Sequence, residues 1–198
     1  MKIYITHYTP LIERKINIIK QLNKSNIFDF TIIENYDKES LTIDDTLKFK
    51  NINMSEISLF LKHNEIFKKE DDDIVVILED DAILVDDFEQ KLQKYITELD
   101  NYDWDILFCG ECCNLHETVI LNKLFYPQTF SRGTCMYILN KGVSSKINKI
   151  FNNEIFINKS IDWWFNIINP KYNLKYLWSE PTLVSQGSEI GIYKSSIR

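Results

Sequence analysis

The sequence contains no long hydrophobic run, no internal repeat and no low-complexity linker. A membrane-spanning helix needs about 20 consecutive apolar residues, and the apolar opening that ends at Pro10 is also too short for a secretory signal. We therefore expect a cytoplasmic protein with no transmembrane segment. Its 198 residues, 44% of them hydrophobic, are expected to form a single domain, residues 1–198, around a buried core.

Clusters of basic residues are also absent. The 23 lysines and arginines are outnumbered by 29 acids, are spread along the chain and leave a net charge of −6. Nucleic acids and anionic membranes attract proteins that gather basic residues on one surface. The sequence therefore predicts no nucleic-acid partner.

The few cysteines and histidines do not have the spacing of a zinc site. Cys112 and Cys113 are adjacent and do not easily bind one ion together with Cys109, and no histidine stands at finger spacing. We expect these three thiols and Cys135 to be reduced and structural.

Short apolar runs alternate with amphipathic stretches. Strands are expected at residues 2–6, 28–33, 104–110 and 134–139 and in the apolar run before Glu79; helices are expected at residues 13–22, 88–99 and 142–150 and after an N-cap at Ser55. This alternation predicts an α/β fold with a mostly parallel central sheet flanked by helices. Ligands of such sheets bind at the carboxyl ends of the strands. The polar stretch 34–53 is expected to be a mobile loop over that site.

Three acids, Glu79, Asp80 and Asp81, follow a strand that is expected to be buried on both faces. Adjacent carboxylates repel one another unless a cation neutralises them. Because side chains alternate along an extended chain, Glu79 and Asp81 should point to one side and hold a divalent cation through oxygen ligands. The alternative is a solvated turn, or acids that cap the next helix.

The order of several segments resembles the family 25 glycosyltransferases, the lipopolysaccharide and collagen-galactosyltransferase group. The acidic segment 77–82 is similar to that family's metal motif, and the strand at residues 104–107 to the one that follows it. The other similar segments are Arg14 in the first helix, residues 55–57 with Lys62 and His63, residues 133–138, 161–163, 180–186 and 195–197.

This resemblance implies a GT-A-like, Rossmann-type nucleotide-sugar fold. It also implies a UDP-sugar donor, commonly of galactose or glucose, a Mn²⁺ or Mg²⁺ ion, and transfer with inversion to a hydroxyl of a glycan or a collagen-like protein. Lys62 stands where the family usually has serine. For the third metal ligand, where many GT-A enzymes have histidine, the tail offers Gln186, Ser188 and Glu189; Gln186 is the predicted one.

The remaining site residues follow from this resemblance and from the strand ends. Asp162 is the predicted catalytic base, with an N-cap as its alternative role, and Trp163 or Trp164 is predicted to stack on a sugar unless both are core residues. Thr6, Tyr8, Tyr36 and Asp37 should flank the uridine. Further donor contacts are predicted at Arg14, His63 and Asp80; the alternatives are a surface charge for Arg14 and a core histidine for His63. Arg132 is predicted to contact a phosphate or the acceptor, with an exposed loop charge as its alternative.

Two other functions use the same features. A metal-dependent phosphohydrolase also carries acids at strand ends, although the three histidines here stand in unrelated segments. A transferase-like domain without activity would bind a glycan or a protein through its aromatic residues. The sequence indicates neither the sugar, the acceptor nor the oligomeric state.

Overall fold

The computed structural model describes residues 1–69 and 73–195. Its strands are β1 (Lys2–Thr6), β2 (Thr31–Ile33), β3 (Val75–Glu79), β4 (Ala82–Leu84), β5 (Ile106–Phe108), β6 (Gly110–Glu111), β7 (Phe125–Gln128), β8 (Met136–Leu139), β9 (Tyr176–Ser179) and β10 (Val184–Gln186). Its helices are α1 (Ile12–Lys24), α2 (Ile43–Thr46), α3 (Met54–Phe67), α4 (Phe88–Leu99), α5 (Val143–Asn153) and α6 (Ile161–Tyr172). None of the described helices is long and apolar enough to cross a membrane.

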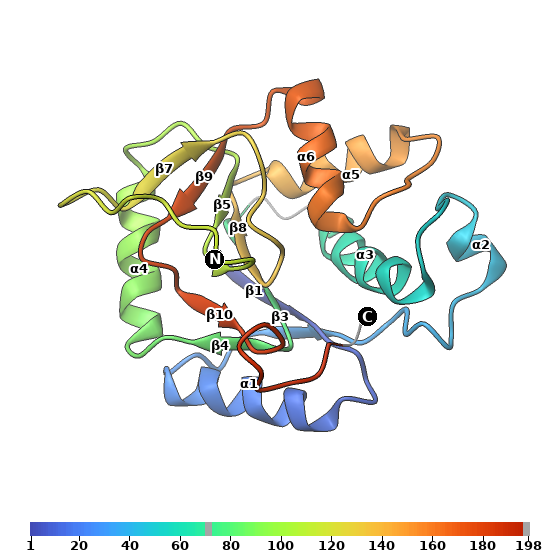
Figure 1. The fold of residues 1–198 in the computed structure, drawn as a ribbon, viewed down its shortest axis with the longest axis horizontal. Coiled ribbons are helices and arrows are strands. Elements are labelled where there is room, and N and C mark those ends of the chain that lie inside the picture. Colours follow the sequence, from blue (N-terminus) through green and yellow to red (C-terminus); the bar gives the residue numbers. More distant parts are fainter. Residues whose placement is uncertain (70–72, 196–198) are drawn as a thin grey trace.

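Seven of these strands form a central sheet in the order β2-β1-β3-β8-β5-β9-β7, and β4-β10-β6 form a smaller one (Figure 1). The central sheet is mixed, which corrects the expected mostly parallel sheet. β1 pairs in parallel with β2 and β3, and β5 with β9, but β8 runs antiparallel between β3 and β5, and β7 antiparallel to β9. The apolar pattern could not predict these strand directions. A strand buried on both faces shows the same continuous apolar run whether it is parallel or antiparallel to its neighbours.

Helices cover both faces of the central sheet. On β3, Val75 and Ile77 face one hydrophobic core, whereas Val76 and Leu78 face another, because successive side chains of a strand point to opposite faces. The first core includes α3, α5 and α6, and the second includes α1 and α4 (Figure 1). This two-sided burial explains why the run before Glu79 shows no polar alternation.

The acidic segment begins at a strand end in the middle of the sheet. Thr6, the last residue of β1, is paired with Glu79, the last residue of β3. The chain then turns through Asp80 and Asp81 into β4, where Ala82 is paired with Gln186 of β10. The pairing of β4 with β10 thus brings the C-terminal part of the chain beside the acids.

Two helix starts differ from the sequence-based expectation. The N-cap of α3 is Asn53 rather than Ser55: the Asn53 side chain accepts a hydrogen bond from the Glu56 backbone N–H at 2.9 Å, and the Glu56 carboxylate accepts one from the Asn53 N–H at 3.0 Å. The N-cap of α6 is Ser160, so Asp162 lies in the first helical turn and is not the cap. Asparagine is as good an N-cap as serine, so the sequence around residues 53–55 fits a start of α3 at either residue.

The segment 34–53 is more structured than a simple loop. It contains α2, which begins with its own capping box, and Phe49 forms a β-bridge with Ile157. The helix after Ser55 is expected to end in a charged turn at residues 68–73, of which residues 70–72 lie outside the described residues. Residues 196 and 197 of the C-terminal segment 195–197 also lie outside them.

Replacing the observed cap should cost more than replacing the expected one. Asn53→Ala removes the capping acceptor and should lower the free energy of unfolding by about 1 kcal/mol, whereas Ser55→Ala should change it by less than about 0.5 kcal/mol. Urea denaturation of the two variants and the parent measures both values. A larger loss in Ser55→Ala would contradict this assignment of the cap.

Candidate functional site

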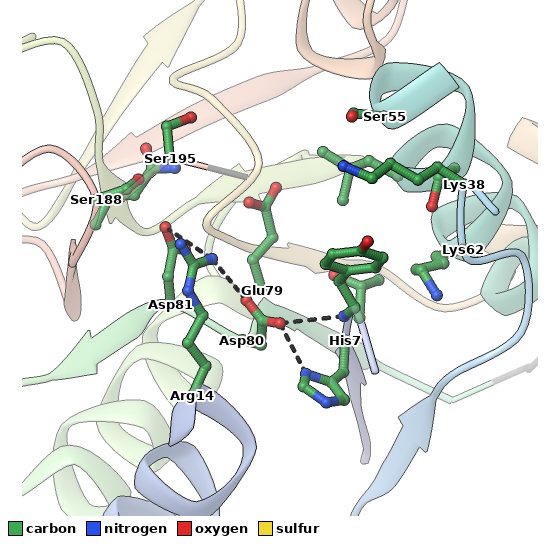
Figure 2. A pocket seen from close by; sticks show the side chains of 15 residues that line it. His7, Arg14, Lys38, Ser55, Lys62, Glu79, Asp80, Asp81, Ser188 and Ser195 are labelled. Carbon is green, nitrogen blue, oxygen red and sulfur yellow. Dashed lines mark hydrogen bonds and ion pairs between the residues drawn. The ribbon is translucent and has the colours of Figure 1, made fainter. Parts of the chain in front are cut away.

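A pocket opens where β1 and β3 end, against α1, α3 and the tail that follows β10. Figure 2 shows Glu79, Asp80 and Asp81 at its centre. Its lining residues are Thr6, His7, Tyr8, Arg14, Lys38, Ser55, Ser58, Leu59, Lys62, Glu79, Asp80, Asp81, Gln186, Ser188 and Ser195. Of the predicted site residues, Thr6, Tyr8, Arg14, the three acids and Gln186 are therefore brought together here.

Asp80 is held by a buried network of hydrogen bonds. Its Oδ2 lies 2.7 Å from His7 Nδ1 and accepts a hydrogen bond from the Tyr8 backbone N–H at 3.2 Å, and its Oδ1 accepts one from Arg14 Nη1 at 3.0 Å (Figure 2). Arg14 also donates to the Lys194 carbonyl and lies over the Tyr193 ring. Asp80, predicted as a donor contact, is thus occupied with fixing α1 and the loop after β1.

Glu79 and Asp81 are buried but less completely satisfied. Glu79 Oε1 accepts a hydrogen bond from Thr134 Oγ1 at 2.6 Å. Asp81 Oδ2 lies 3.8 Å from Arg14 Nη1, while its Oδ1 has no hydrogen-bond partner among the described residues. Burial, and next the neighbouring Glu79 charge, raise the pKa of Asp81 to about 6. A buried carboxylate in this state is a position at which a cation would be favourable.

The residues present suit a hard divalent cation. Glu79 and Asp81 supply carboxylate oxygens, and Gln186, held next to them by the pairing of β10 with β4, supplies an amide oxygen. Three His, Cys, Asp or Glu ligands do not gather around Glu79 within the described part of the chain. Mg²⁺ is often bound by only one or two carboxylates and completes its shell with water and substrate phosphates. The orphaned Asp81 oxygen therefore fits such an ion.

Two histidines from unrelated segments reach the acids, which the sequence did not indicate. His7 contacts Asp80, and His63 Nε2 lies 3.7 Å from Glu79 Oε1, while His63 Nδ1 lies 2.9 Å from the Tyr137 hydroxyl. His63 is fully buried and does not line the pocket. It therefore reaches the pocket only through Glu79, and its contact with the donor stays a prediction. His7 could have been noticed because it directly follows a predicted strand.

Lys62 is a pocket residue that the sequence marked only as a departure from the family. Its ammonium donates to the Asn35 carbonyl at 2.7 Å and to Asp37 Oδ1 at 2.8 Å. Burial lowers the pKa of Lys62, and the hydrogen bond to Asp37 opposes this effect. Asp37 thus holds Lys62 in place and, like Tyr36, does not itself line the pocket.

A second cavity, of about 840 Å³, adjoins the first and shares five lining residues with it: Leu59, Glu79, Gln186, Ser188 and Ser195. Asp162 and Trp163 at the start of α6 line this second cavity. The Asp162 carboxylate accepts a hydrogen bond from Ser160 Oγ at 2.6 Å. Both cavities therefore meet at the acidic segment.

The two adjacent tryptophans have different surroundings. Trp163 is 60% exposed, whereas Trp164 is only 2% exposed and packs in the core against Phe60. Since a helix places consecutive residues about 100° apart, α6 turns one ring to the cavity and the other inward. Of the two predicted sugar platforms, Trp163 alone remains a candidate.

Arg132 is buried and ion-paired in this structure. It is 1% exposed, donates to Glu180 Oε1 at 2.6 Å and to the Ser179 carbonyl at 2.9 Å, and lines neither cavity. The alternative of an exposed loop charge is therefore wrong, because Arg132 is paired with Glu180 in the interior, while the phosphate or acceptor contact stays a prediction.

No family model matches this chain, and no curated protein matches it. Among solved structures, it is similar to A197 from STIV, with 12% identity and a TM-score of 0.46 over 90% of this chain and 81% of that one. It is also similar to a Bacillus anthracis protein assigned as a glucose-1-phosphate thymidylyltransferase and solved with a sucrose, with 13% identity and a TM-score of 0.47 over 90% and 86%. A third is S. aureus TarS 1–349, with 11% identity, a TM-score of 0.48 and coverage of 98% of this chain and 63% of that one.

The chain thus spans less than two thirds of the TarS fragment. These matches do not confirm the resemblance to the family 25 glycosyltransferases, which stays a proposal. The function is therefore argued below from the chemistry of the site.

The raised pKa of Asp81 makes stability depend on pH. Because the folded-state pKa, about 6, lies above the ordinary aspartate value of 3.8, this group stabilises the metal-free fold at low pH, and the contribution is lost as pH rises through about 6. Asp81→Asn should therefore be more stable than the parent at pH 7.5 in chelator, by about 1–3 kcal/mol, and lose this advantage near pH 4. Denaturant titrations at both pH values measure the difference; an equal difference at both would contradict it.

Proposed function

We propose that this chain is a metal-dependent, inverting glycosyltransferase that moves a hexose from a UDP-sugar to an acceptor hydroxyl. The observation that carries the proposal is the pair of buried carboxylates, Glu79 and Asp81, in the first cavity, where Glu79 also borders the second. In this proposal the diphosphate of the donor lies in the first cavity and the acceptor in the second. The resemblance to family 25 supports galactose or glucose as the sugar and a glycan or collagen-like protein as the acceptor.

The donor would occupy the cavity beside β1 and α1. Tyr8 offers an aromatic ring there, and Lys38 and Lys62 offer two cations that favour the negative charge of a diphosphate. The Tyr8 hydroxyl donates a hydrogen bond to Glu39 Oε1 at 2.5 Å. This bond and burial raise the pKa of Tyr8 to about 12, so its ring stays uncharged next to the diphosphate.

Glu79, Asp81 and Gln186 would hold the divalent cation. When bound, such an ion neutralises charge that develops on the leaving diphosphate. Thr134 orients Glu79 through its 2.6 Å hydrogen bond, and Arg14 compensates Asp80, which leaves the other two carboxylates to face the ligand. The buried position of the acids limits access of water to the reacting bond.

Asp162 is our candidate for the base that accepts the proton of the acceptor hydroxyl. An inverting displacement needs this base on the side of the sugar opposite to the leaving group. Asp162 lines the second cavity and not the donor pocket, whereas Arg14 lines the donor pocket and not the second cavity. The Ser160 hydrogen bond fixes the orientation of its carboxylate. Trp163 beside it would stack on a sugar ring of the acceptor.

Turnover should require both carboxylates and the cation. With UDP-glucose or UDP-galactose and Mn²⁺, Asp81→Asn and Asp162→Asn should each lower kcat/KM by about a hundredfold or more, because each removes charge or proton transfer at the reacting centre. UDP release measures this. Asp44→Asn, an exposed acid on α2, is the matched control and should keep parental activity. Turnover that survives chelation would rule the mechanism out.

The exposed tryptophan should act on the acceptor alone. Trp163→Ala should raise KM for the glycan or peptide that supports turnover by about tenfold, the effect of roughly 1.4 kcal/mol of lost contact, and leave calorimetric UDP affinity within about twofold. Ile167→Ala, another exposed apolar residue of α6, serves as control. Weaker UDP binding in Trp163→Ala would place this ring on the donor side instead.

A further inference from the structure

Two of the four cysteines differ from the buried structural thiols that the sequence predicts. Cys109 and Cys135 are buried in the core, but Cys112 and Cys113 line the second cavity. They follow β6, and their sulfur atoms lie 3.3 Å apart. The proposed function uses neither residue.

The backbone explains how adjacent side chains reach the same side. In an extended chain, consecutive side chains point in opposite directions. Cys113 instead has a left-handed conformation, with φ of 56°, which turns its thiol toward that of Cys112. Gly133 makes room for this arrangement, because a Cβ on Gly133 would lie 2.8 Å from both Cβ and Sγ of Cys112.

A carboxylate completes the group. Glu189, in the tail after β10, places Oε1 at 3.5 Å from Cys112 Sγ and at 3.6 Å from Cys113 Sγ. Its Oε2 accepts a hydrogen bond from the Cys113 backbone N–H at 2.7 Å, which fixes the carboxylate. Among the described residues, this is the group of His, Cys, Asp or Glu side chains whose ligand atoms all lie within 4.8 Å of one another.

These spacings are close to those of a zinc site. With bond lengths of about 2.3 Å to sulfur and about 2.0 Å to oxygen, tetrahedral ligands lie roughly 3.8 Å apart for two sulfurs and roughly 3.5 Å apart for sulfur and oxygen. The observed sulfur–oxygen distances match, and the sulfurs would separate slightly. Thiolates select thiophilic ions such as Zn²⁺ over Mg²⁺ or Mn²⁺.

We propose that Cys112, Cys113 and Glu189 form a second metal site, specific for a thiophilic divalent cation such as Zn²⁺. Three protein ligands leave one tetrahedral position open. That position faces the cavity that also contains Asp162 and Trp163, where a water molecule or an oxygen atom of a bound molecule would fill it. This proposal does not depend on the glycosyltransferase proposal.

Binding exchanges protons for the metal. Each thiol loses its S–H proton to solvent as a sulfur–metal bond forms, so one ion releases two protons while Glu189 binds as the carboxylate. In the metal-free chain, burial, and then the hydrogen bond to Cys113 and the charge of Glu189, raise the pKa of Cys112. Because binding releases protons, metal affinity should increase with pH.

Titration of the reduced full-length chain with Co²⁺ tests this site, because cobalt bound to thiolate absorbs strongly in the near ultraviolet. We expect the absorption to saturate at about one ion per chain, as one three-ligand site requires, and to disappear when Zn²⁺ is added. Cys112→Ser and Cys113→Ser should each lose the thiolate absorption or weaken it at least tenfold. Glu189→Gln should retain the absorption but bind Co²⁺ about tenfold more weakly, since one ligand is lost.

Two controls separate this site from the acidic one. Asp81→Asn should keep the full thiolate absorption. Glu98→Gln, which removes an exposed carboxylate of α4, should leave Co²⁺ affinity unchanged. Circular dichroism melts show that each variant is folded. Absence of the thiolate absorption in the folded parent would overturn the proposal, and so would its full retention in Cys112→Ser or Cys113→Ser.

Discussion

The burial of three consecutive carboxylates at the end of β3 is the constraint on which the site depends. Each is less than 9% exposed, and buried charge is unfavourable unless it is paired or hydrogen-bonded. The Asp80 carboxylate is hydrogen-bonded to Arg14, His7 and the Tyr8 backbone N–H. Glu79 accepts a hydrogen bond from the Thr134 hydroxyl, whereas one oxygen of Asp81 has no hydrogen-bond partner among the described residues. Of the three acids, Asp80 is therefore the one whose charge is most closely paired within the described part of the chain.

This compensation also organises distant parts of the chain. Arg14 of α1 contacts both Asp80 and the Lys194 carbonyl, so it ties the first helix to the tail after β10. Gln186 at the end of β10 and Ser188 in this tail line both cavities, and Glu189 of the tail contacts the two thiols. One short segment thus links the acidic site, the cavity at α6 and the cysteine pair, and a ligand at one of these places would contact the segment that shapes the others.

Much of the fold could be predicted because its elements are short and strongly patterned. The continuous run before Glu79 predicted a strand buried on both faces, and two separate cores flank β3. The directions of β7 and β8 could not be predicted, since pairing partners set them. Within the site, the acids, Thr6, Tyr8 and Arg14 share one pocket as expected. Tyr36 and Asp37 do not line it, because proximity along the chain to a strand end does not give side-chain direction.

The sequence by itself determined which segments are buried and where a strand ends in three acids, because local hydrophobic period and charge are properties of neighbouring residues. Only the tertiary structure decided what each acid faces. His7, Arg14 and Thr134 lie 73, 66 and 55 positions from the carboxylates they contact, and such distances along the chain are closed by strand pairing and helix packing. The same reason separates Trp163 from Trp164 and brings Glu189 to Cys112 and Cys113, 77 and 76 positions away.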